Sequence, residues 1–284
     1  MSQGLKITAS SSALGADIEG VDLRRPLDAA AIAQLKAAWR DHLILRFRGQ
    51  SLTDDELVAL SRQFGELDPI PPLSASKRLP GEAGNYVITI SNVIENGETI
   101  GELGDGEAMW HQDMTYIENP PAGAFLYALE VPPEGGDTHF CNLYRAYETL
   151  PEATRQRIAG LSCIHDITLD SSGRPRKGHT PTTDPRQAKG PAHPLVREHP
   201  HSGRKHLFLG RRPFAYIPGL SLEESEDLLD QLWGQLDNDA NCWTQQWQAG
   251  DLILWDNRCT THRRDAFDSQ SRRVMHRTQL AASA

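Results

Sequence analysis

Two segments far apart in the chain contain side chains of the types that bind a metal ion. The first is the motif WHQD at 110–113. If this motif lies on a β-strand, His111 and Asp113 point to the same side, because residues two apart on a strand share a face. A chain of this composition contains about one His-x-Asp match by chance. The motif alone is therefore also explained by an exposed pair that binds nothing.

The second segment is WDNRCTTHRRDAFDSQSRRVMHR at 255–277. Here His262 follows a predicted strand that ends in WDN, and Arg273 begins another predicted strand with Arg277 on the same face. Two imidazoles and one carboxylate on one face of Fe(II) leave three positions open for a chelating 2-oxo acid and dioxygen. Arginine suits the carboxylate of such an acid, because its planar fork binds both oxygens and keeps its proton. The alternative is that both arginines lie on an exposed strand face.

Three helices are predicted where a capping residue precedes an apolar pattern of helical period. Asp28 is the candidate N-cap of the first helix. The second begins with a capping box formed by Thr53 and Glu56. The third begins with a capping box formed by Ser221 and Glu224. The predicted helices span 28–42, 53–65 and a stretch from 221 that has an apolar face at 228–233.

Short β-type runs make up most of the remaining chain. They are 43–47, YVITISN (86–92), AFLYALEV (124–131), DTHFCN (137–142), HPLVREH (193–199), KHLFLG (205–210), DLILWD (251–256) and RRVMHRTQL (272–280). Two irregular stretches, 68–84 and 168–194, are too long for turns and are predicted to form lids. Since no repeat or linker divides the chain, we expect one domain over 1–284. The predicted fold is mostly β with flanking helices, a double-stranded β-helix of the jelly-roll, cupin-like type.

The composition restricts the partners of the chain. A formal charge of −9 disfavours nucleic acid and anionic lipid, which need a basic face. The four cysteines form no CxxC pair, so neither a disulfide framework nor a structural zinc site is expected. No apolar run is long enough for a membrane span, and the N-terminus lacks a signal-peptide pattern. We expect a cytoplasmic homo-oligomer with a small anionic substrate and no nucleic-acid or membrane partner.

Four motifs in order, WHQD, GGDT (135–138), WDNRCTTHR (255–263) and SRRVMHR (271–277), resemble those of the taurine and 2,4-dichlorophenoxyacetate dioxygenase family, TauD/TfdA. The resemblance extends over nearly the whole chain and includes LGADIEGVDLR, LILRFRGQ and RQFGELD. It is closer to the members that cleave phenoxyalkanoates, through GGDTHFCNLYRAYETLP and HPLVREHPHSGRKHLFLG.

The resemblance implies a role for each matched residue. The implied iron ligands are His111, Asp113 and His262. The residues implied to bind the co-substrate 2-oxoglutarate are Thr138 and Arg273, at its distal carboxylate, and Trp255 beside it. Arg277 is implied to meet an anionic group of the substrate or of 2-oxoglutarate. Two anion positions are expected, since four residues on a strand separate the arginines by about 13 Å.

The implied reaction consumes O₂ and 2-oxoglutarate and hydroxylates the substrate. Hydroxylation of a carbon beside an ether oxygen gives a hemiacetal, which collapses to a phenol and a 2-oxo acid. Asp113 favours hydroxylation over halogenation, since halogenating relatives replace this carboxylate by a small residue. Glu107 and DPIPPLSAS at 68–76 depart from the taurine enzymes. The alternatives are an alkylsulfonate or alkyl sulfate dioxygenase and a non-catalytic, cupin-like metal binder.

The loops are expected to distinguish these substrates. An aryl group needs an apolar slot, and the residues that could form one in the first loop are Ile70, Pro71, Pro72 and Leu73. The cations of the second loop are expected to be solvated: Arg174, Arg176 and Lys177. The histidines expected to be core residues without a functional role are His139, His165 and His206.

Overall fold

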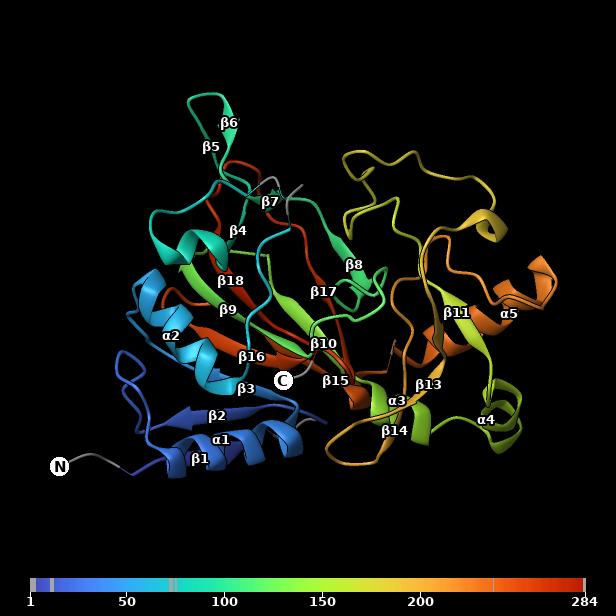
Figure 1. Ribbon diagram of the computed structural model, residues 1–284, viewed down its shortest axis with the longest axis horizontal. Helices are drawn as coiled ribbons and strands as arrows, with labels where there is room; N and C mark the ends of the chain where they lie inside the picture. The colour runs from blue at the N-terminus through green and yellow to red at the C-terminus, as the bar shows by residue number, and fades with distance from the viewer. Residues whose placement is uncertain (1–3, 11–12, 72–73, 75, 237, 283–284) are drawn as a thin grey trace.

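Two β-sheets form the centre of the computed structural model (Figure 1), which describes residues 4–10, 13–71, 74, 76–236 and 238–282. The larger sheet has eight strands, in the order β1 (Lys6–Ala9), β2 (Ala16–Glu19), β3 (Ile44–Phe47), β16 (Leu252–Asp256), β9 (Gly123–Glu130), β18 (Val274–Leu280), β4 (Ile88–Ser91) and β7 (Glu102–Leu103). The smaller sheet has four, in the order β15 (Cys242–Gln245), β10 (Thr138–Asn142), β17 (Thr260–Arg264) and β8 (Ala108–His111). Most neighbours are antiparallel; β2 and β3, and β4 and β7, run parallel.

Short pairs of strands and five α-helices surround the two sheets. The strand pairs are β5 (Ile94–Glu95) with β6 (Glu98–Thr99), β11 (Ser162–Ile164) with β12 (Ala192–Pro194), and β13 (Val196–Glu198) with β14 (Lys205–Leu207). The α-helices are α1 (Ala29–His42), α2 (Asp54–Phe64), α3 (Leu143–Glu148), α4 (Glu152–Ile158) and α5 (Leu222–Trp233). Short 3₁₀ turns lie at Glu82–Asn85, Pro185–Gln187, Gly234–Leu236 and Asp239–Asn241.

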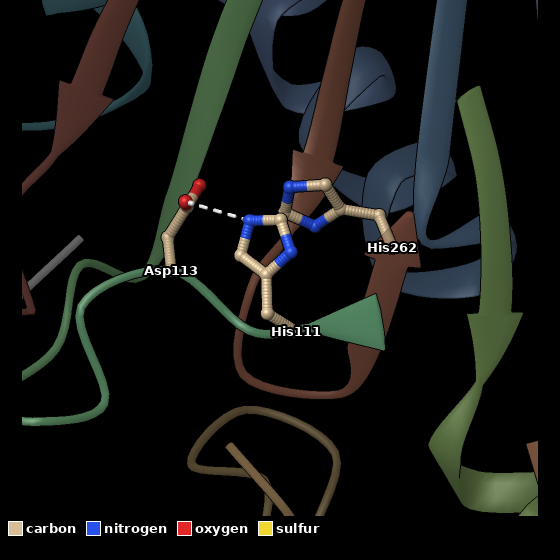
Figure 2. Close-up of side chains that lie close together, drawn as sticks. All are labelled: His111, Asp113 and His262. Carbon is tan, nitrogen blue, oxygen red and sulfur yellow. Dashed lines mark ion pairs between the residues drawn. The ribbon is translucent and has the colours of Figure 1, made fainter. Parts of the chain in front are cut away.

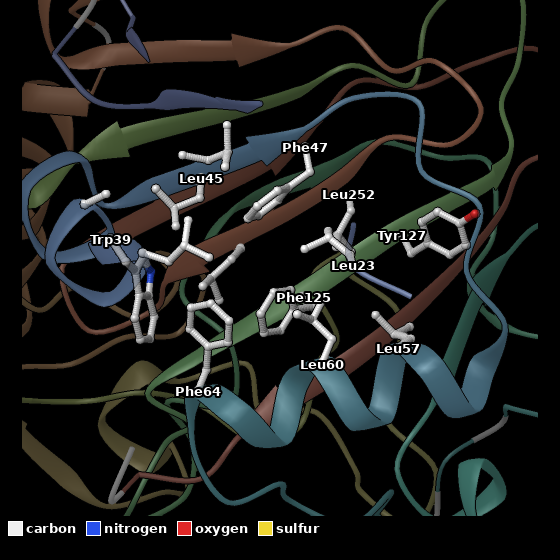
Figure 3. Close-up of a cluster of buried hydrophobic side chains, with 14 of the residues drawn as sticks. Leu23, Trp39, Leu45, Phe47, Leu57, Leu60, Phe64, Phe125, Tyr127 and Leu252 are labelled. Carbon is white, nitrogen blue, oxygen red and sulfur yellow. The ribbon is translucent and has the colours of Figure 1, made fainter. Parts of the chain in front are cut away.

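The larger sheet is buried on both faces. On β16, Leu252 and Leu254 belong to one apolar cluster, and Ile253 and Trp255 belong to another, because alternate residues of a strand point to opposite faces. The first cluster lies under α1 and α2, which contribute Trp39 and Phe64 among others (Figure 3). The second includes Phe140 of the smaller sheet. The two sheets therefore face each other across an apolar core.

A third apolar cluster lies on the far side of the smaller sheet. It contains Cys141 of β10 together with leucines of α3, α5 and β14. Because Phe140 belongs to the core between the sheets and Cys141 to this outer cluster, the inner face of β10 presents Thr138 and Phe140. The smaller sheet is thereby held from outside while its inner face is turned to the larger sheet.

The three predicted helices are confirmed with their caps. Asp28 accepts the N–H of Ala31 at the start of α1, and both capping boxes form, at Thr53 and at Ser221. The β-type runs are confirmed except for HPLVREH, which is split at Leu195 into β12 and β13 with different partners. Leu195 connects the two strand pairs: its N–H donates to the carbonyl oxygen of Leu161, and its carbonyl oxygen accepts the N–H of Phe208, both at 2.9 Å.

Two further predictions about local structure are wrong. The helices α3 and α4 lie where no helix was predicted. His262 follows β16, as predicted, and lies within the next strand, β17. Asp113 lies in a turn that follows the end of β8 at His111. Among the described residues, no helix is long and apolar enough to cross a membrane.

Candidate active site

His111, Asp113 and His262 converge at the inner face of the smaller sheet (Figure 2). His111 and His262 are directly paired across β8 and β17, and their ring centroids are 4.2 Å apart. Asp113 Oδ1 lies 3.7 Å from His111 Nε2. One ligand atom from each of the three lies within 4.8 Å of the other two. This spacing is compatible with a single ion held between them.

The hydrogen bonds around the three side chains fit a bound cation. His111 Nδ1 lies 2.7 Å from the carbonyl oxygen of Met109, and a proton on Nδ1 leaves Nε2 with a free lone pair. Asp113 Oδ2 and His262 Nδ1 are buried and have no hydrogen-bond partner among the described residues. A buried carboxylate oxygen without a donor is costly. A divalent cation between the three side chains would remove that cost.

The protonation states also suit metal binding. Burial lowers the pKa of His111 to about 3 and also lowers the pKa of His262. Burial alone would raise the pKa of Asp113, but the charge of Arg277 and its hydrogen bond help to outweigh burial, and that pKa is lowered. At neutral pH the site therefore presents two neutral imidazoles and one carboxylate, the forms that bind metals.

Two amide side chains, for which the sequence predicted no role, fix the backbone around these ligands. Gln112 Nε2 donates to the carbonyl oxygens of Asn257 and Arg258, at 2.9 and 3.2 Å. Its Oε1 accepts the N–H groups of Leu209 and Gly210, at 3.0 and 3.2 Å. Gln112 thus connects the loop after β8, the loop after β16 and the segment after β14.

Asn257 holds Asp113 through its main chain. Asn257 Oδ1 accepts the N–H of Asp113 at 2.7 Å, and Nδ2 donates to the carbonyl oxygens of Asp113 and Pro121, both at 3.0 Å. Gln112 belongs to the motif WHQD and Asn257 to the motif WDN. Their positions in these motifs were the only signal in the sequence for a structural role.

Arg273 is buried and Arg277 is half-buried, so the alternative of an exposed strand face is wrong. Arg277 lies on β18, and its Nη1 donates to Asp113 Oδ1 at 3.1 Å. Arg273 directly precedes β18 and is 2% exposed. Its Nε has no partner, and within the described part of the chain Arg273 forms no ion pair with a carboxylate. Burial lowers the pKa of Arg273 well below its usual value.

Thr138 and Trp255 lie on opposite sheets near His262. Thr138 begins β10, and its Oγ1 accepts a hydrogen bond from Trp247 Nε1 at 2.9 Å. The ring of Trp255 meets that of His262 edge to face, with centroids 5.3 Å apart. Trp255 Nε1 is buried without a partner among the described residues. Thr138 and Trp255 are thus both buried between the sheets.

A cavity of about 820 Å³ opens beside the three converging side chains. It is lined by His111, Asp113 and Arg277, but not by Thr138, Trp255, His262 or Arg273. The stretch 168–194 forms part of its wall, and the cationic side chains that line it are Arg174, Arg176, Lys177, Arg211 and Arg277. Carboxylates also line the cavity, so an anion would be held by an individual cation such as Arg277 and not by a net positive charge of the wall.

The predicted features of the loops are confirmed in part. Pro71 lines the cavity, but Ile70 is buried in the core between the sheets and does not line it. Pro72 and Leu73 lie outside the described residues. Arg176 is half-buried and lies over the ring of Tyr116 at 4.1 Å, so the prediction of a solvated side chain is wrong for it. Arg174 is exposed as expected.

Of the three histidines predicted to be core residues, His165 and His206 are buried, but His139 is half-buried, so the prediction is wrong for His139. His139 Nε2 lies 2.7 Å from Asp265 Oδ2, and His206 Nδ1 lies 2.8 Å from the carbonyl oxygen of Leu207. His165 is buried against the ring of Phe208. None of the three belongs to the group that converges with Asp113.

A family model described as "Taurine catabolism dioxygenase TauD, TfdA family" matches residues 6–279. The chain belongs to the TauD/TfdA family of dioxygenases. The predicted family is thereby confirmed.

Curated relatives of the TauD/TfdA family match at full length. An (S)-phenoxypropionate/alpha-ketoglutarate-dioxygenase of Delftia acidovorans is 34% identical, over 99% of this chain and 96% of the relative. An alpha-ketoglutarate-dependent 2,4-dichlorophenoxyacetate dioxygenase of Cupriavidus pinatubonensis is 32% identical, over 92% of each chain. Among solved structures, AAD-2 in complex with Mn(II) and N-oxalylglycine is similar to this chain. The two sequences are 27% identical, and the TM-score is 0.78 over 98% of both chains. These matches confirm the predicted enzyme class, a 2-oxoglutarate-dependent dioxygenase.

Proposed function

We propose that this chain is an Fe(II)- and 2-oxoglutarate-dependent dioxygenase that cleaves an aryloxyalkanoate ether to a phenol and a 2-oxo acid. The observation that carries the proposal is the convergence of two neutral imidazoles and one carboxylate, with donor atoms within 4.8 Å of one another, beside a cavity. Such a set is typical of mononuclear non-haem iron oxygenases and leaves positions open for a chelating acid and O₂.

His111, Asp113 and His262 are proposed to hold the iron, and Arg273 to bind the distal carboxylate of 2-oxoglutarate. Arg273 is buried without a carboxylate partner among the described residues, and a bidentate carboxylate is the partner that an arginine fork fits. The other residues proposed at the co-substrate are Thr138, a hydroxyl donor, and Trp255, an apolar wall. These roles are assigned because the residues occupy the positions that match the motifs of the family.

The bound iron and 2-oxoglutarate would supply the oxidising chemistry, with one oxygen atom of O₂ entering succinate and the other the substrate. The protein places the substrate and excludes water. Asp113 stays ionised because Arg277 donates to it, and the buried Thr138 and Trp255 limit the access of water to the region beside His262. The hydroxylated carbon beside the ether oxygen then releases the phenol as the hemiacetal collapses.

The two facing sheets are proposed to form a double-stranded β-helix, the jelly roll predicted from the sequence, within one domain over 1–284. A fold of this kind suits the site, because the two histidines come from the inner face of one sheet, Asp113 from the turn after β8, and Arg277 from the other sheet. Neighbouring strands hold the histidines and Arg277 in fixed register.

The substrate class rests on the cavity and on the relatives. Relatives named for phenoxypropionate and 2,4-dichlorophenoxyacetate are 32–34% identical to this chain. Leu103 and Ile167 offer apolar surface to an aryl ring, and Arg277, beside the iron ligands, is proposed to bind the carboxylate. An alkylsulfonate or alkyl sulfate would need the same cation but no aryl slot.

The test compares two products under the same iron, ascorbate and 2-oxoglutarate conditions: phenol from phenoxyacetate or 2-phenoxypropionate, and sulfite from taurine. Phenol with stoichiometric succinate is expected. Sulfite without phenol would overturn the substrate class. Absence of any substrate-stimulated succinate formation across both groups, in protein that binds iron, would favour the non-catalytic metal binder.

A further inference from the structure

A second buried arginine lies beside Arg273. Arg264 is the last residue of β17 and is 5% exposed. It lies two residues after His262, so both side chains point from the inner face of the smaller sheet. Its Cα partner on β10 is Thr138, which places the side chains of Arg264 and Thr138 next to each other on that face.

The guanidinium groups of Arg264 and Arg273 lie against the same aromatic ring. Their Cζ atoms are 5.3 and 6.0 Å from the centroid of Phe267. Burial, and after it the charge of Arg264, lowers the pKa of Arg273. Two cations from opposite sheets therefore meet at one buried place near Thr138.

Neither arginine has an anionic partner within the described part of the chain. No ion pair to a carboxylate forms at either residue, and the Nε atoms of both are buried without a hydrogen-bond acceptor. Arg264 Nη2 donates to the carbonyl oxygen of Gly106, which is neutral. The carboxylate of Asp105 is near enough for its charge to act on Arg264, but it forms no ion pair with it. Two buried cations without an ion pair are costly, and an anionic ligand that reaches both would offset that cost.

We propose that Arg264 and Arg273 together bind the distal carboxylate of 2-oxoglutarate, with the hydroxyl of Thr138 as a further donor. The inference rests on the proposed function and adds a second cation to the co-substrate site. It makes the site selective for dicarboxylic 2-oxo acids, because an acid without the distal carboxylate leaves two buried guanidinium groups unpaired.

The neighbouring Arg263 provides a matched control. It lies on the same strand but points to the other face, where it pairs with Asp265 at 2.6 Å and with Glu107 at 3.8 Å. Arg263→Gln removes the same charge from the same strand without removing a donor from the inner face. Any long-range effect of lost charge should therefore be common to Arg263→Gln and Arg264→Gln.

The experiment measures binding of two ligands to Mn(II)-loaded protein by calorimetry: 2-oxoglutarate, and 2-oxopentanoate, which has the same carbon chain without the distal carboxylate. Arg264→Gln is expected to weaken the binding of 2-oxoglutarate about 10- to 100-fold, as for a lost charge-assisted hydrogen bond. The same substitution is expected to change the affinity for 2-oxopentanoate less than about threefold. Arg263→Gln should leave both affinities near those of the parent protein.

The ratio of the two ligand affinities decides the proposal. Equal loss for both ligands, or no loss for 2-oxoglutarate in Arg264→Gln, would overturn it. If that variant does not fold, Arg264→Met removes the charge but keeps a long side chain, and an unchanged ligand ratio in it overturns the proposal as well. A parent protein that binds Mn(II) but not 2-oxoglutarate would refute the proposed function itself, whereas an unaffected variant of a binding parent refutes only the role of Arg264.

Discussion

Replacing Asn257 by alanine should weaken metal binding although Asn257 is not a ligand. Its carboxamide makes three hydrogen bonds, two to the main chain of Asp113 and one to that of Pro121. The side chain is 1% exposed, so water cannot easily replace these bonds. Without them the turn that carries Asp113 is free to shift relative to His111 and His262.

Two magnitudes follow from these contacts. Three hydrogen bonds at about 0.5–1.5 kcal/mol each predict a loss of roughly 2–4 kcal/mol in the free energy of unfolding. Loss of a residue that orients a metal ligand typically lowers metal affinity about 10- to 100-fold. The second effect should appear as a weaker dissociation constant even at temperatures where the variant is fully folded.

Mn(II) titration by calorimetry, together with thermal unfolding of the metal-free protein, separates the two effects. Asn142→Ala is the matched control, because Asn142 is also buried and also makes three hydrogen bonds: from the N–H groups of Tyr144 and Arg145, and to the carbonyl oxygen of Ala13. It should lose stability and keep its metal affinity. If Asn257→Ala binds Mn(II) as tightly as the parent protein, the positioning role of Asn257 is refuted. It is also refuted if Asn142→Ala loses as much metal affinity as Asn257→Ala.

Arg273→Ala should raise the 2-oxoglutarate requirement far more than the substrate requirement, because a buried carboxylate would lose its bidentate partner at a cost of about 2–5 kcal/mol. Titration of succinate formation measures this, and an unchanged requirement would sink the assignment. His206→Gln should flatten the acid dependence of stability, since burial lowers the pKa of His206 from 6.5 to about 4. The unfolded chain binds this proton below about pH 6.5 and the folded one only near pH 4, so the free energy of unfolding falls by about 3 kcal/mol as the pH drops through that window. Urea unfolding at pH 7 and pH 4.5 measures the free energy of unfolding of parent and variant. An equal loss of this free energy between the two pH values in both proteins would contradict the prediction.

Local signals in the sequence were sufficient for the long helices. The capping boxes at Thr53 and Ser221 satisfy the first N–H groups of α2 and α5 from within four residues, so no distant partner is needed. The helices α3 and α4 lacked a capping box and a long apolar pattern. Helix α3 is capped by Asn142 but has only six residues and begins directly at the end of β10, and α4 begins at Glu152 with Pro151 as its N-cap and without a side-chain cap. Their stability comes from packing in the third apolar cluster, which local pattern does not reveal.

The predicted metal ligands converge for a reason that differs from the prediction. The spacing of His111 and Asp113 was expected to place both on one strand, but Asp113 lies in a turn and is directed by Asn257, 144 residues away. A motif states which side chains occur together, whereas the partner of an amide such as Asn257 depends on the tertiary fold. The contact between Arg277 and Asp113 was likewise beyond what strand spacing predicts.

The four hydrogen bonds of Gln112 would allow substrate preference to change while the backbone at the proposed iron ligands stays in place. Each of these bonds runs from the side chain of Gln112, in the motif WHQD, to a main-chain atom of another segment, and two of them reach the segment at 209–210. The side chain of the next residue, Arg211, lines the cavity and is not among them. Selection or engineering at Arg211 can therefore alter the cavity wall while the backbone beneath it keeps its course. Gln112→Glu, of nearly equal size, has no such freedom, because a carboxylate cannot donate to two carbonyl groups.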